Sequence, residues 1–324
     1  MQHQRGPSEC PALRPLGLCR PRGAPLTVLG IDIGGSATKY APVRNGEIAV
    51  PVMRADTPQS LEELLEWLGG LVTTARREWN VAAVGIGVPG FMRLQDGVIV
   101  RSPNLMFLNG TAFATEMSRR VSLPVKVEND ANCAALGAWV SQPPPRPRCL
   151  VHLTLGTGVG SGIILDGRPW RGACGYAAEL GHVVVHPQGR ACGCGGRGCA
   201  ETEASETGIL RTWSEARPDS EISSARQVYQ LVEAGDADAR RAFRRAGRYL
   251  GILLSNIANC LNPDIITIGG GVAAAGETIL APAHAEMAVR LHQHARECTR
   301  IEVADRDDYG ILGAARLLHK DAQA

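Results

Sequence analysis

Four residues of metal-binding type lie close together near the middle of the chain. They are His182, Cys192, Cys194 and Cys199, and the stretch between them is rich in glycine, which lets the chain turn back on itself. One imidazole and three thiolates suit tetrahedral zinc, and four protein ligands leave no open position for a reacting water. The pattern therefore predicts a structural zinc site, with a redox cluster as the alternative.

Two glycine-rich turns each separate an apolar strand from a second strand. The first turn comprises residues 34–39, GGSATK, and the second comprises residues 156–160, GTGVG. Neither matches a Walker A loop or the dinucleotide-binding fingerprint, because the required residues do not follow the glycines. Backbone N–H groups in such turns can hold phosphate oxygens, and the alternative is an ordinary hairpin. A third glycine run, at residues 269–271, also follows a predicted strand and favours phosphate binding.

Two carboxylates stand where acid–base or hydroxyl-binding chemistry is feasible. Asp130 lies where a predicted strand ends and a helix begins, so it is either a helix N-cap or a general base for an attacking hydroxyl. Glu179 precedes His182 by three residues, so the two side chains share a face on a turn or helix. A metal-bound imidazole can then present its other nitrogen to a ligand hydroxyl. Alone, Glu179 would read as a surface or capping carboxylate.

Composition narrows the class of protein. The 324 residues are 44% hydrophobic, which is enough for a sizeable core and favours two domains. A net charge of +2 gives no broad field for capturing nucleic acid, and no apolar run is long enough to span a membrane. Residues 1–25 are rich in Pro and Arg and contain no signal-peptide core, so they are expected to form a disordered leader. We therefore expect a cytoplasmic protein with reduced cysteines.

The order of predicted elements indicates two α/β units. An antiparallel opening, whose third strand spans residues 47–54, is followed by a predicted helix over residues 56–79. Residues 28–43 and 150–165 both read as strand, glycine turn and strand, which suggests duplicated domains that face each other. The proline run at residues 143–147 marks the boundary between them. Further helical segments are predicted over residues 111–121, 130–140, 207–262, 277–296 and 309–320.

Seven short motifs follow the leader in a fixed order: DIGGSATK, GVPG, ENDA, GTGVGSG, ELGH, CGCGGRGCAE and IGGGV. With these motifs in this order, the chain resembles the ROK family of sugar kinases over essentially everything after the leader. The resemblance implies an α/β, two-lobed, actin/hexokinase-like (ribonuclease-H-like) fold with ATP and sugar in the interdomain cleft. The N-terminal lobe would comprise residues 26–143 plus 305–324. The C-terminal lobe would comprise residues 144–304, with a zinc knuckle at residues 182–199.

The resemblance also assigns roles to residues. Asp130 would be the catalytic base, and Asp32 would hold Mg²⁺ through water, the alternative being a carboxylate that caps the turn. The sugar would be bound by Asn104, Asn129, Asp130, Glu179, His182 and Glu201. ATP would be bound by Asp32, Gly34, Gly35, Thr38, Lys39, Gly156, Thr157, Gly158, Gly160, Gly270 and Gly271, although Lys39 alone reads as a solvated charge. Zinc would be held by His182, Cys192, Cys194 and Cys199, as in other family members.

The expected activity is that of an ATP-dependent hexose kinase, most like the glucokinases of the family, which make glucose 6-phosphate. N-Acetylmannosamine, N-acetylglucosamine or another hexose is the alternative substrate. A sugar-responsive transcriptional regulator is the alternative of another class, but the 25 residues before the first strand are too few for its winged DNA-binding domain. The resemblance implies a homodimer or higher oligomer, and we expect no nucleic acid or membrane partner.

Overall fold

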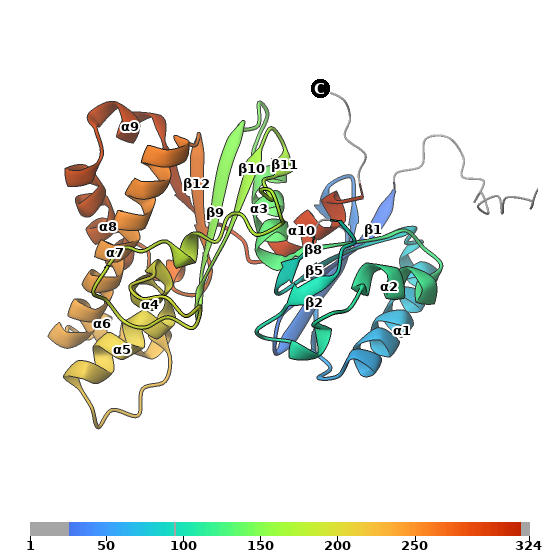
Figure 1. Ribbon diagram of the computed structural model, residues 1–324, viewed down its shortest axis with the longest axis horizontal. Helices are drawn as coiled ribbons and strands as arrows, with labels where there is room; N and C mark the ends of the chain where they lie inside the picture. The colour runs from blue at the N-terminus through green and yellow to red at the C-terminus, as the bar shows by residue number, and fades with distance from the viewer. Residues whose placement is uncertain (1–25, 94, 319–324) are drawn as a thin grey trace, which may run out of the picture.

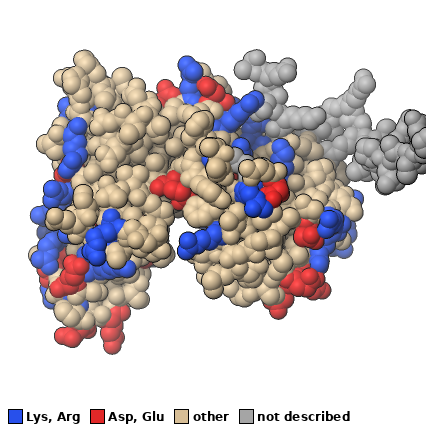
Figure 2. Space-filling model, viewed as in Figure 1, with Lys and Arg blue, Asp and Glu red and all other residues tan. Residues whose placement is uncertain are grey.

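The computed structural model describes residues 26–93 and 95–318, and the predicted leader lies outside them. The described chain forms two groups of elements, each built around its own sheet (Figure 1). On the face shown in Figure 2 the molecule is hollowed between these groups, and acidic and basic side chains are mixed rather than segregated. No helix in the described ranges is long and apolar enough to cross a membrane.

The first sheet has the strand order β3-β2-β1-β5-β8, with β4 also paired to β2. Its strands are β1 (Thr27–Ile33), β2 (Ala37–Arg44), β3 (Glu47–Ile48), β4 (Met53–Asp56), β5 (Ala83–Val88) and β8 (Val125–Asn129). β1 is antiparallel to β2 and parallel to β5, which is parallel to β8. The predicted single strand over residues 47–54 is wrong, because the chain breaks into β3 and β4 around Pro51, which has no N–H for a sheet ladder.

The second sheet repeats this topology in the order β11-β10-β9-β12-β13. Its strands are β9 (Cys149–Leu155), β10 (Val159–Leu165), β11 (Arg168–Pro169), β12 (Ile265–Gly269) and β13 (Arg300–Val303). β9 is antiparallel to β10 and parallel to β12, which is parallel to β13. Both sheets therefore begin with a hairpin whose turn is glycine-rich, as the repeated strand–turn–strand pattern predicts. The exact lobe boundaries stay a prediction.

Helices α3 (Asp130–Val140) and α10 (Tyr309–Arg316) lie between the two sheets (Figure 1). Their backbones approach closely because glycines stand at the crossing. A Cβ added at Gly137 would lie 1.9 Å from the Tyr309 carbonyl oxygen, and one at Gly313 would lie 1.8 Å from the Cys133 carbonyl oxygen. A shared apolar core joins these helices to strands of both sheets, so the lobes meet through packed structure rather than a loose linker.

The remaining helices cover the outer faces. α1 (Leu61–Trp79) and α2 (Phe113–Val121) pack on the first sheet. The core of the second sheet is shared by α4 (Ala200–Ala204), α5 (Glu206–Ala216), α6 (Ala225–Glu233), α7 (Ala237–Leu261) and α8 (Glu277–Arg290). α9 (Gln293–Cys298) packs against α7 and α8. The helix predicted from residue 56 begins only at Leu61, because the Ser60 side chain caps it. The helix predicted over residues 277–296 is interrupted after Arg290, where Leu291 is extended.

Candidate active site in the cleft

One cavity of about 680 Å³ lies where the two lobes face each other. The β8–α3 junction and residues 89–91 and 101–104 line one side, and the turn after β9, residues 179–182 and parts of the cysteine loop line the other. The predicted site residues that the cavity brings together are Asn104, Asn129, Asp130, Thr157, Gly158, Gly160, Glu179, His182, Cys194 and Glu201. Motifs from four distant stretches of sequence thus share a single space.

Asp130 is the first residue of α3, but it is not the residue that caps the helix. The N-cap is Asn129, whose Oδ1 accepts a hydrogen bond from the Asn132 N–H at 3.0 Å. Asp130 Oδ1 accepts from the Ala131 N–H at 2.9 Å and from Asn129 Nδ2 at 3.1 Å. Asp130 Oδ2 has no hydrogen-bond partner among the described residues. Helix capping therefore does not account for Asp130, and one of its carboxylate oxygens is free to contact a ligand.

The electrostatic surroundings of Asp130 suit a base that works near neutral pH. Burial, together with the charge of the neighbouring Asp32 carboxylate, raises the pKa of Asp130 to about 7. Burial likewise raises the pKa of Asp32 to about 6, while Lys39 acts in the opposite direction. A carboxylate with a pKa near the working pH can both accept a proton and release it again, as general acid–base catalysis requires.

Glu179, His182 and Glu201 form the facing side of the cavity. His182 belongs to a 3₁₀ turn (Leu180–His182) that follows Glu179, and its Nε2 lies 4.0 Å from Glu179 Oε2. Glu201 Oε2 accepts from the Val159 N–H at 3.2 Å, which holds this carboxylate against the turn between β9 and β10. A Cβ on Gly158 would lie 2.3 Å from the same oxygen, so a larger residue there would displace the Glu201 carboxylate. Burial raises the pKa of Glu179, and the Glu201 charge acts in the same direction.

The four predicted metal ligands converge. Their ligand atoms all lie within 4.8 Å of one another. Cys192 Sγ is 3.6 Å from His182 Nδ1, and Cys194 Sγ is 3.7 Å from Cys199 Sγ. Zinc bond lengths of about 2.3 Å to sulfur and about 2.0 Å to nitrogen place tetrahedral ligand atoms roughly 3.5–3.8 Å apart. The Gly196 N–H donates to Cys194 Sγ at 3.4 Å and lowers the pKa of that thiol. The donor set and its spacing fit zinc.

The glycine turns lie at neighbouring strand ends. Gly270 has φ +90°, and a Cβ there would lie 2.3 Å from the Leu155 carbonyl oxygen, which also accepts from the Val272 N–H at 3.0 Å. The turn after β12 therefore lies against the end of β9, beside the turn of residues 156–160. In the first lobe, a Cβ on Gly35 would lie 3.2 Å from Asn104 Cβ, which places the turn after β1 beside the sugar-binding stretch predicted at Asn104.

Ten predicted site residues do not line the cavity itself: Asp32, Gly34, Gly35, Thr38, Lys39, Gly156, Cys192, Cys199, Gly270 and Gly271. The side chains of two of them form hydrogen bonds within the protein that stabilise the fold. The Thr38 side chain is fully buried, and its hydroxyl lies 2.9 Å from the Thr57 hydroxyl. Lys39 Nζ donates to Asp307 Oδ2 at 2.8 Å and to the Asp307 carbonyl at 3.0 Å. Their roles toward ATP stay predictions.

Sequence reasoning missed several residues of the site. Phe91, Arg101, Thr207 and Arg211 also line the cavity. Arg101 directly precedes the SPNL stretch that contains Asn104, so its position in the sequence could have indicated it. The ion pair between Arg171 and Glu128 has no such signal, because the two residues are 43 positions apart.

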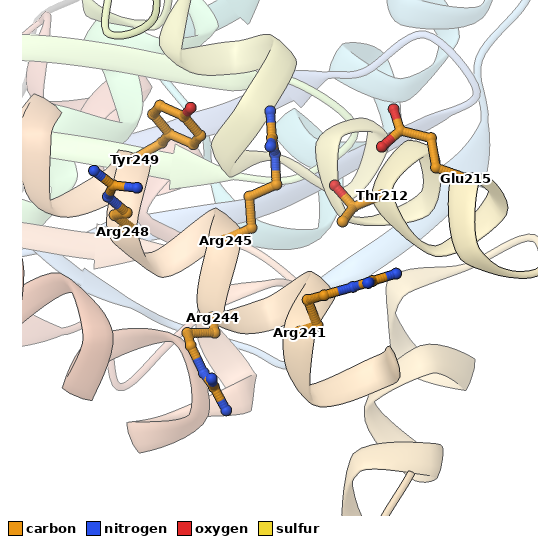
Figure 3. Close-up of a pocket in the computed structure, with 7 residues that line it drawn as sticks. All are labelled: Thr212, Glu215, Arg241, Arg244, Arg245, Arg248 and Tyr249. Carbon is orange, nitrogen blue, oxygen red and sulfur yellow. The ribbon is translucent and has the colours of Figure 1, made fainter. Parts of the chain in front are cut away.

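A second hollow, of about 490 Å³, lies on α5 and α7 and is rich in arginine (Figure 3). Its basic side chains do not converge, since Arg244 and Arg245 point in opposite directions in Figure 3. Arg245 pairs with the buried Glu203 at 2.8 Å, Arg241 with Asp238 at 3.5 Å, and Arg248 with Glu286 at 3.3 Å. These guanidinium groups are committed to carboxylates of the fold, so the cleft is the better candidate for an active site.

Comparison with known proteins agrees with the fold and the motifs. The ROK family model matches residues 28–321, so the chain belongs to the ROK family. The glucokinase of Halalkalibacterium halodurans is 33% identical, with 87% of this chain and 89% of the relative aligned. An N-acetyl-D-glucosamine kinase of Escherichia coli O6:H1 is 31% identical over 90% of this chain and 98% of the relative. The crystal structure of a Streptomyces griseus ROK glucokinase in complex with glucose and AMPPNP superposes with a TM-score of 0.77 at 30% identity, covering 90% of this chain and 98% of that one. The expected family and two-lobed α/β fold are confirmed.

Proposed function

We propose that the protein is an ATP-dependent hexose kinase that phosphorylates the 6-hydroxyl of glucose. The observation that carries this proposal is a carboxylate, Asp130, with one free oxygen and a pKa near 7, placed across the cavity from Glu179 and His182. The relatives named glucokinase and the structure with glucose and AMPPNP support the same activity. N-Acetylglucosamine, N-acetylmannosamine and other hexoses are the alternative substrates.

Asp130 takes the proton of the attacking hydroxyl as the oxygen bonds to the γ-phosphorus of ATP and ADP leaves. Asn104, Asn129, Glu179, His182 and Glu201 bind the sugar hydroxyls and orient the ring. The turns at residues 34–39 and 156–160, together with Gly270 and Gly271, bind the nucleotide through backbone N–H groups. Asp32, which lies close enough to Asp130 to raise its pKa, would hold Mg²⁺ through water.

Zinc bound by His182, Cys192, Cys194 and Cys199 is the structural cofactor of this site. The His182 ring supports this role, because Nδ1 faces Cys192 while Nε2 faces Glu179 on the cavity side. A ligand bond at Nδ1 fixes the orientation of the ring, so Nε2 is held toward the sugar. The metal would supply structure by holding the His182 ring in place, with no chemistry of its own.

Glucose is proposed ahead of the acetylated sugars because the site offers hydroxyl-binding groups and a short loop. Only nine residues separate His182 from Cys192, the short form that resembles glucokinases and acetylmannosamine kinases. Such a loop provides few groups to recognise an acetamide. A site built to hydrogen-bond a hydroxyl rejects an analogue that lacks it by a factor of up to ~10⁴.

The test is a panel of glucose, mannose, fructose, allose, N-acetylglucosamine and N-acetylmannosamine under equal ATP and Mg²⁺. We expect the highest kcat/KM for glucose. If an acetylated sugar leads by more than about tenfold, the glucokinase assignment is wrong while the hexose kinase assignment stands. We further propose that the enzyme works in the cytoplasm. We also propose that it is a homodimer or higher oligomer, and sedimentation equilibrium tests this oligomeric state.

A further inference from the structure

The carboxylate of Glu128, at the end of β8, is buried and fully hydrogen-bonded. Its Oε1 accepts from the Asn129 N–H at 2.9 Å and from Asn132 Nδ2 at 3.1 Å. Its Oε2 accepts from Arg171 Nε at 2.6 Å and lies 2.6 Å from a terminal guanidinium nitrogen of the same residue. Only 5% of Glu128 is exposed, so Arg171 supplies the positive charge that makes this buried carboxylate tolerable.

This pair is linked by short steps to the proposed base. Glu128 fixes the Asn129 backbone and the Asn132 side chain, and the Asn132 N–H in turn holds Asn129 Oδ1. The other end of the Asn129 side chain donates to Asp130 Oδ1 and to the Gly90 carbonyl at 3.1 Å each. The orientation of Asn129 and Asp130 therefore depends on Glu128, and the charge balance of Glu128 depends on Arg171.

The backbone of Arg171 begins the loop that leads to Glu179 on the facing wall. Its carbonyl accepts from the Gly175 N–H at 3.1 Å and from the Ala177 N–H at 3.3 Å, which closes the loop into a compact turn. The far end is fixed by Ser161, whose hydroxyl donates to the Ala178 carbonyl and accepts from the Leu180 N–H at 3.0 Å. Arg171 follows β11, which lies beside α3 in the contact region between the lobes (Figure 1).

We infer that Arg171 is a positioning residue that holds the Asn129–Asp130 wall and the Glu179 wall of the sugar site in register. Its side chain pairs with Glu128 in the strand that precedes Asp130, and its backbone starts the turn that precedes Glu179. The inference rests on the proposed hexose kinase activity and adds to it a residue outside the cavity lining. Lysine cannot replace it fully, because one ammonium cannot reproduce two nitrogens in a planar fork on a single carboxylate oxygen.

The test is the Arg171→Met variant, compared with Arg171→Lys, Glu128→Gln and the double variant Arg171→Met/Glu128→Gln. We expect Arg171→Met to lower kcat/KM for the sugar by about 10- to 100-fold, as for other residues that orient a binding group. The KM for ATP should stay within about twofold, because the pair contacts neither glycine turn. Arg171→Lys should retain part of the activity. Glu128→Gln preserves the side-chain shape and removes the charge, and the double variant should be no worse than the worse single variant.

The matched control is Arg148→Met, which removes an arginine of the same lobe whose partner is the exposed Asp166. This variant should keep wild-type kinetics. A value of kcat/KM for the sugar within about threefold of wild type in Arg171→Met overturns the inference. A parallel loss for sugar and ATP that follows a fall in melting temperature also overturns it, because general destabilisation then explains the result. Absence of sugar-stimulated turnover in the wild type is a separate outcome that removes the proposed function and this inference together.

Discussion

The two walls of the cleft are built by different means. Asp130 and Asn129 stand where a strand of a six-stranded sheet runs directly into a helix, so regular backbone and an N-cap place them. The opposite wall, residues 171–199, consists mainly of turns, one short 3₁₀ helix and isolated bridges such as Val184–Cys199. A wall made of regular elements is fixed by the fold, whereas the facing wall depends on side-chain contacts and on the proposed zinc. A change at Asp130 in the first wall should therefore affect chemistry, and changes in the second wall should affect sugar binding.

The largest effect is expected from Asp130→Asn. The amide keeps an oxygen for the Ala131 N–H but cannot take a proton, so turnover should fall by ~10² to 10⁴ while sugar binding stays near wild type and the melting temperature does not fall. Calorimetric titration with glucose and a steady-state kinase assay measure the two quantities. The control is Asp166→Asn, an exposed carboxylate paired with Arg148, which should leave both unchanged. Turnover of Asp130→Asn close to wild type would remove Asp130 from the role of base.

A smaller effect, on binding, is expected from Cys194→Ser. Loss of one thiolate should abolish stoichiometric zinc and raise the KM for sugar by about 10- to 100-fold, because His182 is no longer held toward the cleft. Elemental analysis and kinetics on the same samples provide the test, with Cys260→Ser on the exposed surface of α7 as control. Full zinc occupancy in the Cys194→Ser variant, or none in the wild type, would contradict the zinc proposal.

The pH dependence of kcat/KM for the sugar should reflect the protonation of Asp130 in the first wall. Because burial and the Asp32 charge raise the pKa of Asp130 to about 7, the base becomes protonated as the pH falls through neutrality. The rate should then fall by about tenfold per pH unit below that value and level off above it. A profile of kcat/KM for the sugar between pH 5.5 and pH 8.5 measures this. The interval extends ~1.5 pH units on either side of the pKa. A flat profile would mean that Asp130 titrates in the ordinary range of an aspartate.

The same pKa shift should make the stability of the fold fall as the pH rises, whereas the rate rises with pH. The folded-state pKa of Asp130 lies above its unfolded value, so the contribution of this group to stability is present below the unfolded value of 3.8 and is lost as the pH rises to about 7. Asp130→Asn should therefore weaken the decline in stability of the ligand-free protein between about pH 4 and pH 7. Chemical denaturation of both proteins across this interval measures the difference, and identical slopes would argue against a raised pKa.

The smallest effect is expected from Ala178→Gly in the second wall. Ala178 has φ +68°, a conformation that costs an L-residue energy, and it directly precedes Glu179. Glycine relieves this strain but adds chain entropy to the unfolded state and removes a methyl group that is buried in the core, so the unfolding free energy is expected to change by no more than about 0.5 kcal/mol. Urea denaturation tests it, and a loss of about 1 kcal/mol or more would show that the methyl group supports the wall.

The sequence predicts those parts of this site whose residues lie close together in the chain. The cysteine cluster, the glycine turns and Asp130 are each recognisable within a few residues, because local spacing determines which ligand atoms can meet. The capping role of Asn129 was not predicted, since either residue at the junction suits an N-cap. The break at Pro51 and the partners of Thr38 and Lys39 were also missed. The Thr38 and Lys39 partners depend on tertiary pairing, and so does the Arg171–Glu128 ion pair, whose residues are 43 positions apart.

The most direct test of the hexose kinase assignment is the identity of the product formed from ATP and glucose by the purified wild-type protein. Phosphorus and carbon NMR of the reaction, with ADP quantified in parallel, should show glucose 6-phosphate and ADP in equal amounts, and ADP release should depend on the sugar. If no sugar in the panel stimulates ATP consumption while zinc is bound, the enzyme assignment is wrong. If the phosphate instead appears at another hydroxyl, the placement of the 6-hydroxyl against Asp130 is contradicted.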